Sequence, residues 1–322
     1  MRLTGYVIRK TREMVTVYWE LARIVVPVSI ATEALSRLGV IEALSPLLSP
    51  AMDLFGLPPE LGLAWLTGLL VGIWGAISLI FTLVPVTDLT AADITVFSAL
   101  LLFAHALPIE QKIIQKAGPA MVLTISLRIG GGMLYAFLLH QVLAATGWLS
   151  AAADPAWIPM GSVTGWPDFF FGLVEALASM FCVLIGLVFA LDILERSGVM
   201  ALMMKTLSPV LRLAGIRREA EQFASVGLFL GISYGGGLLI REARSGTVPP
   251  RDIFVACIFM GFSHSIIEDT VVVMTIGADF TGVFVGRLLF TVVASAVIAL
   301  MIRSVRDETF FAWMFRGARQ TT

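Results

Sequence analysis

The sequence predicts an all-α polytopic membrane protein built from two inverted-topology repeats. Three observations support this prediction: the composition, a self-similarity at a fixed 159-residue offset (264 − 105 for one matched pair), and the distribution of basic residues between loops. Of the 322 residues, 58% are hydrophobic and 14% are charged. Soluble domains are about 45–50% apolar and about 25% charged. Several apolar segments also exceed the roughly 18–20 residues that a helix needs to span a bilayer.

The chain begins with a basic segment. Arg2, Arg9, Lys10 and Arg12 lie within residues 1–19, which lack the compact apolar stretch and small-residue cleavage site of a signal peptide. We therefore expect an amphipathic helix on the cytoplasmic surface. The remaining predicted divisions are a first repeat over 20–146, a periplasmic connecting loop over 147–167, a second repeat over 168–304 and a cytoplasmic tail over 305–322.

An internal duplication relates the two halves of the chain. The 159-residue offset aligns glycines and charged residues better than apolar residues, which chance similarity between apolar segments does not produce. The aligned pairs include Gly39 with Gly198, Gly72 with Gly231, Asp93 with Asp252, His105 with His264, Gly118 with Gly277 and Arg128 with Arg287.

Each repeat is predicted to contain about three transmembrane helices and one short re-entrant or broken helix. The short helix begins at Asp93 in the first repeat and at Asp252 in the second, and a histidine motif interrupts it. A glycine-rich span precedes it, at 61–82 and at 222–241. We expect the short helix to enter the membrane and return on the same side, with the histidine motif at its inner end.

The positions of Lys and Arg predict that the two repeats face opposite sides of the membrane. Residues 42–60 contain no Lys or Arg, whereas their equivalent, 199–221, is basic; conversely, 109–118 is basic and 267–278 is not. The C-terminus is rich in arginine, so both chain termini are placed in the cytoplasm. Three arginines do not fit, because this topology places them outside: Arg241, Arg244 and Arg251.

Two related motifs place histidines and carboxylates inside apolar sequence: Phe-Ser-His-Ser-Ile-Ile-Glu-Asp-Thr at 262–270 and Phe-Ala-His-Ala-Leu-Pro-Ile-Glu at 103–110. Ionisable side chains at membrane depth are costly, and they usually face the bundle interior or a cavity. Inverted repeats with interrupted helices hold substrate near the bilayer midplane. The candidate substrate- or ion-binding residues are therefore His105, Glu110, His264, Ser265, Glu268, Asp269 and Thr270.

The second motif carries more of this chemistry than the first. His264 and Glu268 are four residues apart and would share one face of a continuous helix. With Asp269 and His105, they are candidate ligands for a divalent metal ion. Glu110 aligns with Asp269, but an isoleucine aligns with Glu268, so we expect a site weighted toward the second repeat. The alternative is that these polar groups only hold the helix bundle together.

Other residues are candidates for a supporting role. Arg128 and Arg287 could attract an anionic substrate, or neutralise Glu110 and Asp269 as buried ion pairs, which we favour. A run of glycines can unwind a helix beside a site, although close helix packing is its more common role. The glycine-rich span of the second repeat supplies three such candidates: Ser233, Gly235 and Gly236.

The repeated glycine-rich span, the short helix led by Asp-Ile and the Phe-x-His motif resemble the nucleoside recognition, or Gate, domain membrane proteins. That family includes the spore maturation proteins A and B and the membrane part of ferrous-iron transport protein B. The resemblance covers essentially the whole chain as two Gate units and implies a transporter-like protein of the bacterial inner membrane. The sequence lacks GxxxxGK[ST], so it departs from the iron transporter in that no G domain is expected.

These features predict a secondary transporter that moves a small polar solute, nucleoside-like or another organic molecule, through a site between the repeats. Coupling to H⁺ or Na⁺ is compatible with histidines, which titrate near neutral pH. The alternative substrate is a divalent metal ion. The alternative from another class is a membrane enzyme acting on a lipid-linked substrate, which we do not favour because no activated nucleophile accompanies the histidines.

No resident cofactor is expected. The expected partners are the lipid bilayer, a small-molecule or ion substrate, and a second copy of the chain in a homodimer. No basic patch interleaved with aromatic residues indicates nucleic acid.

Overall fold

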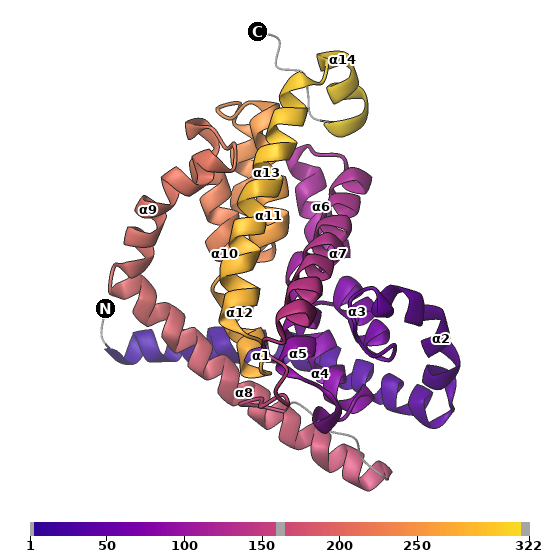
Figure 1. The fold of residues 1–322 in the computed structure, drawn as a ribbon. Helices are drawn as coiled ribbons and strands as arrows, with labels where there is room; N and C mark the ends of the chain where they lie inside the picture. Colours follow the sequence, from indigo (N-terminus) through magenta and orange to yellow (C-terminus); the bar gives the residue numbers. More distant parts are fainter. Residues whose placement is uncertain (1–2, 159–164, 317–322) are drawn as a thin grey trace.

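A computed structural model describes residues 3–158 and 165–316 (Figure 1). This part of the chain is helical, with two isolated β-bridges and no strand. The helices of the first half are α1 (Leu3–Arg37), α2 (Val40–Asp53), α3 (Leu61–Leu70), α4 (Ile73–Leu83), α5 (Ala91–Phe103), α6 (Leu107–Ala117) and α7 (Met121–Thr146). Those of the second half are α8 (Trp166–Arg196), α9 (Val199–Leu213), α10 (Arg218–Arg244), α11 (Pro250–Ser263), α12 (Glu268–Thr275), α13 (Arg287–Ser304) and the short α14 (Asp307–Thr309).

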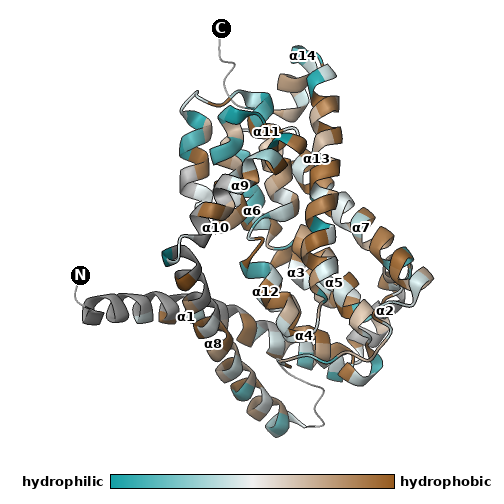
Figure 2. Cartoon of the chain, turned by 60° about the vertical axis from the view of Figure 1, so that its left-hand side comes forward, coloured by the Kyte–Doolittle hydropathy of each residue, from teal (hydrophilic) through white to brown (hydrophobic). Residues whose placement is uncertain are grey.

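Within the described residues, five helical segments are long and apolar enough to cross a membrane. The segments are Ala91–Ala117, Met121–Thr146, Trp166–Gly186, Pro250–Thr275 and Thr281–Ser304. Two of them run through the histidine motifs and are largely buried. Figure 2 shows hydrophobic residues along most of α13, as expected for a helix that faces lipid. The predicted all-α polytopic membrane fold is confirmed.

The first helices of the two repeats pack against each other. The rings of Tyr18 in α1 and Phe181 in α8 are 5.0 Å apart. The guanidinium of Arg37, at the end of α1, lies 5.2 Å from the ring of Trp166, at the start of α8. The two helices therefore run in opposite directions. α1 continues through residue 19 without interruption, so the predicted N-terminal segment belongs to the same helix as the start of the first repeat.

Both glycine-rich spans are hairpins that enter the bundle and turn back. In a straight helix, residues eight apart are separated by about 12 Å. A Cβ added to Gly68 in α3 would nevertheless lie 3.2 Å from the Cβ of Ala76 in α4. In α10, a Cβ on Gly235 would lie 3.1 Å from Cγ1 of Val226, nine residues earlier. The turns are at Gly72 (φ 131°, ψ 177°) and Gly231 (φ 77°, ψ 166°), a backbone region that essentially only glycine adopts.

These hairpins correct the predicted assignment of the re-entrant segment. The histidine segments do not return to the side from which they start. Instead, each is a broken helix whose second part, α6 or α12, continues beyond the motif. The predicted three transmembrane helices of each repeat included the glycine-rich span. In the structure this span is the element that reverses direction, because its glycine permits the turn.

The α10 hairpin also corrects the placement of the three arginines that did not fit. Arg217, just before α10, lies 3.2 Å from Asp252, at the start of α11. Arg251 in turn lies 2.5 Å from Asp307, in the C-terminal segment. Both ends of α10 are therefore at the same end of the molecule as the basic C-terminus. Arg241, Arg244 and Arg251 therefore lie on the side predicted for the C-terminus, and the misfit disappears when α10 turns back rather than crosses.

The two broken helices run in opposite directions. The N-terminal end of α5 and the C-terminal end of α12 both bind the central connection, through bonds from Ala91 N–H to the Ala151 carbonyl and from Trp157 N–H to the Thr275 carbonyl (both 3.0 Å). The C-terminal end of α6 lies at the other end, where Arg316 N–H donates to the Gly118 carbonyl (2.8 Å). This antiparallel pair supports the predicted inversion of the two copies, whose orientation in a membrane remains a prediction.

The duplication extends to unusual backbone angles. Ala106 (φ 46°) and Ser265 (φ 47°) are two of three non-glycine residues with positive φ in the described chain, and they are related by the same offset as His105 and His264. Four pairs of glycines with positive φ are also related by this offset: Gly39 with Gly198, Gly56 with Gly215, Gly72 with Gly231 and Gly118 with Gly277.

A buried site between four helix interruptions

Breaks in two helices place the histidines. α5 ends at Phe103, and Ala106 takes a left-handed conformation before α6 begins. α11 ends at Ser263, and Ser265 takes the equivalent conformation before α12. At each break, Nδ1 of the histidine bonds to the carbonyl of the residue four positions earlier. The distances are 2.9 Å from His105 to Leu101 and 3.1 Å from His264 to Met260.

The two histidines meet at the centre of the fold. Their Nε2 atoms are 3.2 Å apart, and both side chains are buried. Oε1 of Glu110 lies 3.2 Å from Nε2 of His264. Oδ2 of Asp269 lies 3.6 Å from Nε2 of His105. Each repeat therefore contributes one imidazole and one carboxylate, so the site is shared almost evenly between the halves rather than weighted toward the second.

Two fully buried arginines hold the broken helix ends. Arg128 in α7 donates from Nη1 to Glu110 Oε2 (2.7 Å) and from Nε to the Phe103 carbonyl (2.9 Å). Arg287 in α13 donates to the carbonyls of Phe262 (2.8 Å) and Leu102 (2.8 Å), and to that of His264 (3.2 Å). Carbonyls at the last turn of a helix lack intrahelical donors, and these guanidinium groups supply them.

The predicted ion pairs are thus confirmed for one arginine. Arg128 pairs with Glu110, as expected. Among the described residues, Arg287 has no ion pair with Asp269 within 4.0 Å, because its donors are directed at backbone carbonyls. That part of the prediction was wrong.

The tips of the glycine hairpins reach the same place. A Cβ on Gly231 would clash with Oγ of Ser265, and a Cβ on Gly72 would lie 3.7 Å from that of Ala106. Backbone bonds join hairpin and break, since Ala106 N–H donates to the Gly68 carbonyl (3.0 Å) and Ile266 N–H to the Leu228 carbonyl (3.0 Å). Four helix interruptions, two from each half, therefore surround the histidine pair.

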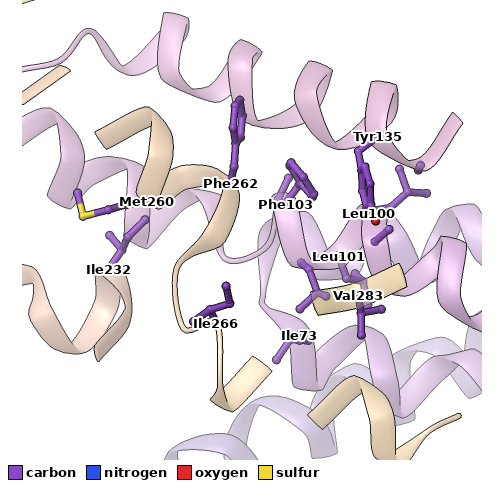
Figure 3. Close-up of a cluster of buried hydrophobic side chains, with 14 of the residues drawn as sticks. Ile73, Leu100, Leu101, Phe103, Tyr135, Ile232, Met260, Phe262, Ile266 and Val283 are labelled. Carbon is purple, nitrogen blue, oxygen red and sulfur yellow. The ribbon is translucent and has the colours of Figure 1, made fainter. Parts of the chain in front are cut away.

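An aromatic cluster packs beside the site. The rings of Phe103 and Phe262 are 5.4 Å apart, and that of Tyr135 lies 5.3 Å from Phe103. Figure 3 shows Phe262 and Phe103 at the ends of the two broken helices, with Tyr135 beyond them. The carbonyls of the same two phenylalanines accept from the arginines. The apolar packing therefore fixes the backbone that positions the histidines.

The remaining predicted site residues fall in different places. Thr270 is buried beside Asp269, and Ser265 touches the hairpin tip. Glu268 does not share a helical face with His264, because the intervening chain is broken and α12 begins only at Glu268. No described hydrogen bond or ion pair joins Glu268 to either histidine, whereas Asp269 faces the pair. The proposed pairing of His264 with Glu268 is not formed: the nearby carboxylate of His264 is Glu110, and that of His105 is Asp269.

The supporting candidates of the second glycine-rich span are also revised. Gly235 and Gly236 are helical and buried, and a Cβ on Gly236 would lie 2.9 Å from the side chain of Ile113 in α6. They permit close packing, and the unwinding occurs at Gly231. The side chain of Ser233 lies outside the described residues. The signal that marks Gly72 and Gly231 was present in the sequence, since the 159-residue offset pairs them.

Comparison with known proteins gives the family. A family model described as Gate, nucleoside recognition, matches this chain twice, over residues 18–120 and 177–280. The chain belongs to the Gate family. The two matches to Gate start at residues 18 and 177. These positions are separated by the same offset as His105 and His264, and as the paired residues with positive φ.

A relative is similar over nearly the whole chain. The uncharacterized membrane protein YvoD of Bacillus subtilis (strain 168) is 26% identical over 296 residues, which are 87% of this chain and 90% of YvoD. No solved structure matches. The similarity to this membrane protein thus extends through both halves of the chain.

Proposed function

We propose that this Gate protein is a secondary transporter of the bacterial inner membrane. Its solute-binding site would be the space around His105 and His264, where the two repeats meet. The observation that supports this most directly is the convergence of four helix interruptions on one buried cluster of ionisable groups. Irregular backbone at membrane depth is tolerated inside protein or beside a cavity, and in transporters it marks the binding site.

The hairpins suggest how access would alternate. The α3–α4 hairpin starts and ends at the end of the molecule where the central connection lies, while the α10 hairpin starts and ends at the C-terminal end. Each tip contacts one break beside the histidines. Withdrawal of one hairpin would open the site to one side only, while the other hairpin keeps the opposite side closed.

The enzyme alternative has less support. Acid–base chemistry at the histidines would need a nucleophile or an activated water within hydrogen-bond reach. Among the described serines, threonines and cysteines, none is hydrogen-bonded to either histidine, and Oγ of Ser263 donates to the Phe259 carbonyl instead (2.8 Å).

A polar organic solute, such as a nucleoside, remains a candidate cargo of the transporter.

The test is independent of the cargo. Cysteine is introduced at Ala106 or Ser265, the paired break positions, in a chain with Cys182→Ser and Cys257→Ala, reconstituted in proteoliposomes. A membrane-impermeant maleimide applied from either side should modify each of the two introduced cysteines. Ser150→Cys, in the central connection, should react from one side only. Labelling of A106C and S265C from a single side under all conditions, or no labelling at all, would overturn the proposal.

A further inference from the structure

The hydrogen bonds of the histidine pair determine where the ring protons are. Nδ1 of each ring is bonded to a backbone carbonyl, which can only accept, so Nδ1 carries the proton in both rings. A neutral imidazole has one N–H, and therefore both Nε2 atoms present lone pairs. These two lone-pair nitrogens are the atoms that face each other at 3.2 Å.

Two carboxylate oxygens join the same point. Oε1 of Glu110 lies 3.2 Å from Nε2 of His264, and Oδ2 of Asp269 lies 3.6 Å from Nε2 of His105. Oδ2 of Asp269 is buried and, among the described residues, has no hydrogen-bond donor. With both Nε2 atoms unprotonated, four acceptor atoms gather around the histidine pair, and such an arrangement is repulsive unless a cation shares them.

Most of the distances between these atoms approach those between the ligands of a transition-metal ion. Ligand atoms about 2.0–2.1 Å from a Zn²⁺-like ion are about 3.3–3.4 Å from one another in a tetrahedron. Three separations around the histidine pair, at 3.2, 3.2 and 3.6 Å, are close to this value, and Nε2 of His105 lies farther from Oε1 of Glu110, at 4.0 Å. One ligand atom from each of His105, His264 and Asp269 lies within 4.8 Å of the others. The alternative cation is a proton shared by the two Nε2 atoms. Such a proton would leave Oδ2 of Asp269 without a hydrogen-bond donor.

We propose that a divalent first-row transition metal ion, of the Zn²⁺, Co²⁺ or Mn²⁺ kind, binds between His105, His264, Asp269 and Glu110, and that it is the cargo. This inference rests on the proposed transport function. Two imidazoles with two carboxylates suit these ions, whereas Mg²⁺ and Ca²⁺ prefer oxygen alone and Cu⁺ prefers sulfur. The carbonyls on both Nδ1 atoms orient the imidazoles, and Arg128 orients Glu110, as partners of metal ligands commonly do.

The surrounding charge suits release as well as binding. The charges of Arg128 and Arg287 formally cancel those of Glu110 and Asp269, so a dication at this site would keep its net charge. Conduction requires a site that binds well enough to admit an ion and weakly enough to let it leave. If the metal ion were a permanent structural element, we would not expect two buried arginines beside its ligands.

Cobalt is the probe for binding, because the absorption of Co²⁺ reports tetrahedral coordination. Detergent-purified protein treated with EDTA should bind Co²⁺ with a tetrahedral spectrum that excess Mg²⁺ does not remove. Asp269→Asn and His105→Gln should weaken binding by at least about 100-fold, since loss of an orienting partner alone costs about 10–100-fold. Glu268→Gln is the matched control, because this neighbouring carboxylate does not contact the histidines, and it should bind as the wild type does.

Two outcomes would overturn the metal proposal: no Co²⁺ binding by folded wild-type protein, or equal losses in E268Q and D269N. Thermal unfolding of each variant identifies a loss that is due to misfolding, and a glutamine at 264 supplies a second ligand variant. Mn²⁺ uptake into proteoliposomes then tests cargo. Metal binding without labelling of A106C from both sides would contradict transport, whereas two-sided labelling without Co²⁺ binding would contradict only the metal.

Discussion

His105 and His264 present the same ring nitrogen to each other, with 3.2 Å between the two Nε2 atoms, because each Nδ1 is bound to a carbonyl four residues earlier. The two residues occupy equivalent positions of a duplicated sequence, and each lies where its helix ends. The duplication therefore gives the pair its symmetry, and the helix breaks supply the carbonyls that fix the tautomer.

A first prediction concerns that tautomer. In Zn²⁺-loaded protein, both histidines should carry the proton on Nδ1 and present an unprotonated Nε2 to the ion, because a carbonyl accepts from each Nδ1. Solid-state NMR of ¹⁵N-histidine-labelled protein would measure this directly, with His140→Gln removing the third histidine signal. A protonated Nε2 on either residue of the loaded pair would contradict the assignment.

A second prediction concerns the buried ion pair of Arg128 and Glu110. Arg128→Met leaves a buried carboxylate without its partner and should destabilise the protein by about 3–5 kcal/mol. The double variant Arg128→Met with Glu110→Gln should recover part of that loss, because the unpaired charge is then removed. Both are measured by unfolding in detergent with EDTA present, so that metal binding does not contribute.

Arg306→Met is the control for this cycle. The side chain of Arg306 lies 3.5 Å from that of Glu308, and both are largely exposed to solvent (82% and 79%). Loss of this exposed ion pair should therefore not measurably change stability. Additive effects of the R128M and E110Q substitutions would show that the 2.7 Å contact contributes no coupling energy.

A third prediction concerns the path of α10. A straight helix of 27 residues would be about 40 Å long and would place its ends on opposite sides of a membrane. The hairpin instead places Glu219 and Thr247 at one end of the molecule. Cysteines at these two positions should react with an impermeant reagent from the same side, and Ser150→Cys from the other. Labelling of E219C and T247C from opposite sides would mean that α10 is a simple crossing.

The sequence was sufficient for the membrane class, the repeat and the association of the histidines. Charged residues at membrane depth are costly, so His105, Glu110, His264 and Asp269 could be recognised without a structure. The reversal of α10 could not be predicted from the sequence, because hydropathy is the same for a straight helix and for one that turns back. The difference depends on the backbone angles of Gly231, which composition does not determine.

The choice between Glu268 and Asp269 was similarly beyond the sequence. On an unbroken helix, Glu268 would face His264, since four residues make about one turn. The break at His264 and Ser265 removes that relationship, and α12 then directs Asp269 toward His105. The alignment of Asp269 with Glu110 was the better guide, because it reflects equivalent positions in the two repeats rather than an assumed helix.

A fourth prediction tests the hairpin tip itself. Gly231 combines φ 77° with ψ 166°, and a Cβ there would clash with Oγ of Ser265. Gly231→Ala should therefore destabilise the protein by about 1–3 kcal/mol from backbone strain alone, and should weaken Co²⁺ binding because the displaced Ser265 adjoins His264. Gly186→Ala, at a helical glycine of α8 with no atom near its added Cβ, should have little effect or stabilise slightly. Thermal unfolding and Co²⁺ titration of the two variants in parallel make the comparison. Equal stability of G231A and G186A would mean that the chain does not reverse at Gly231.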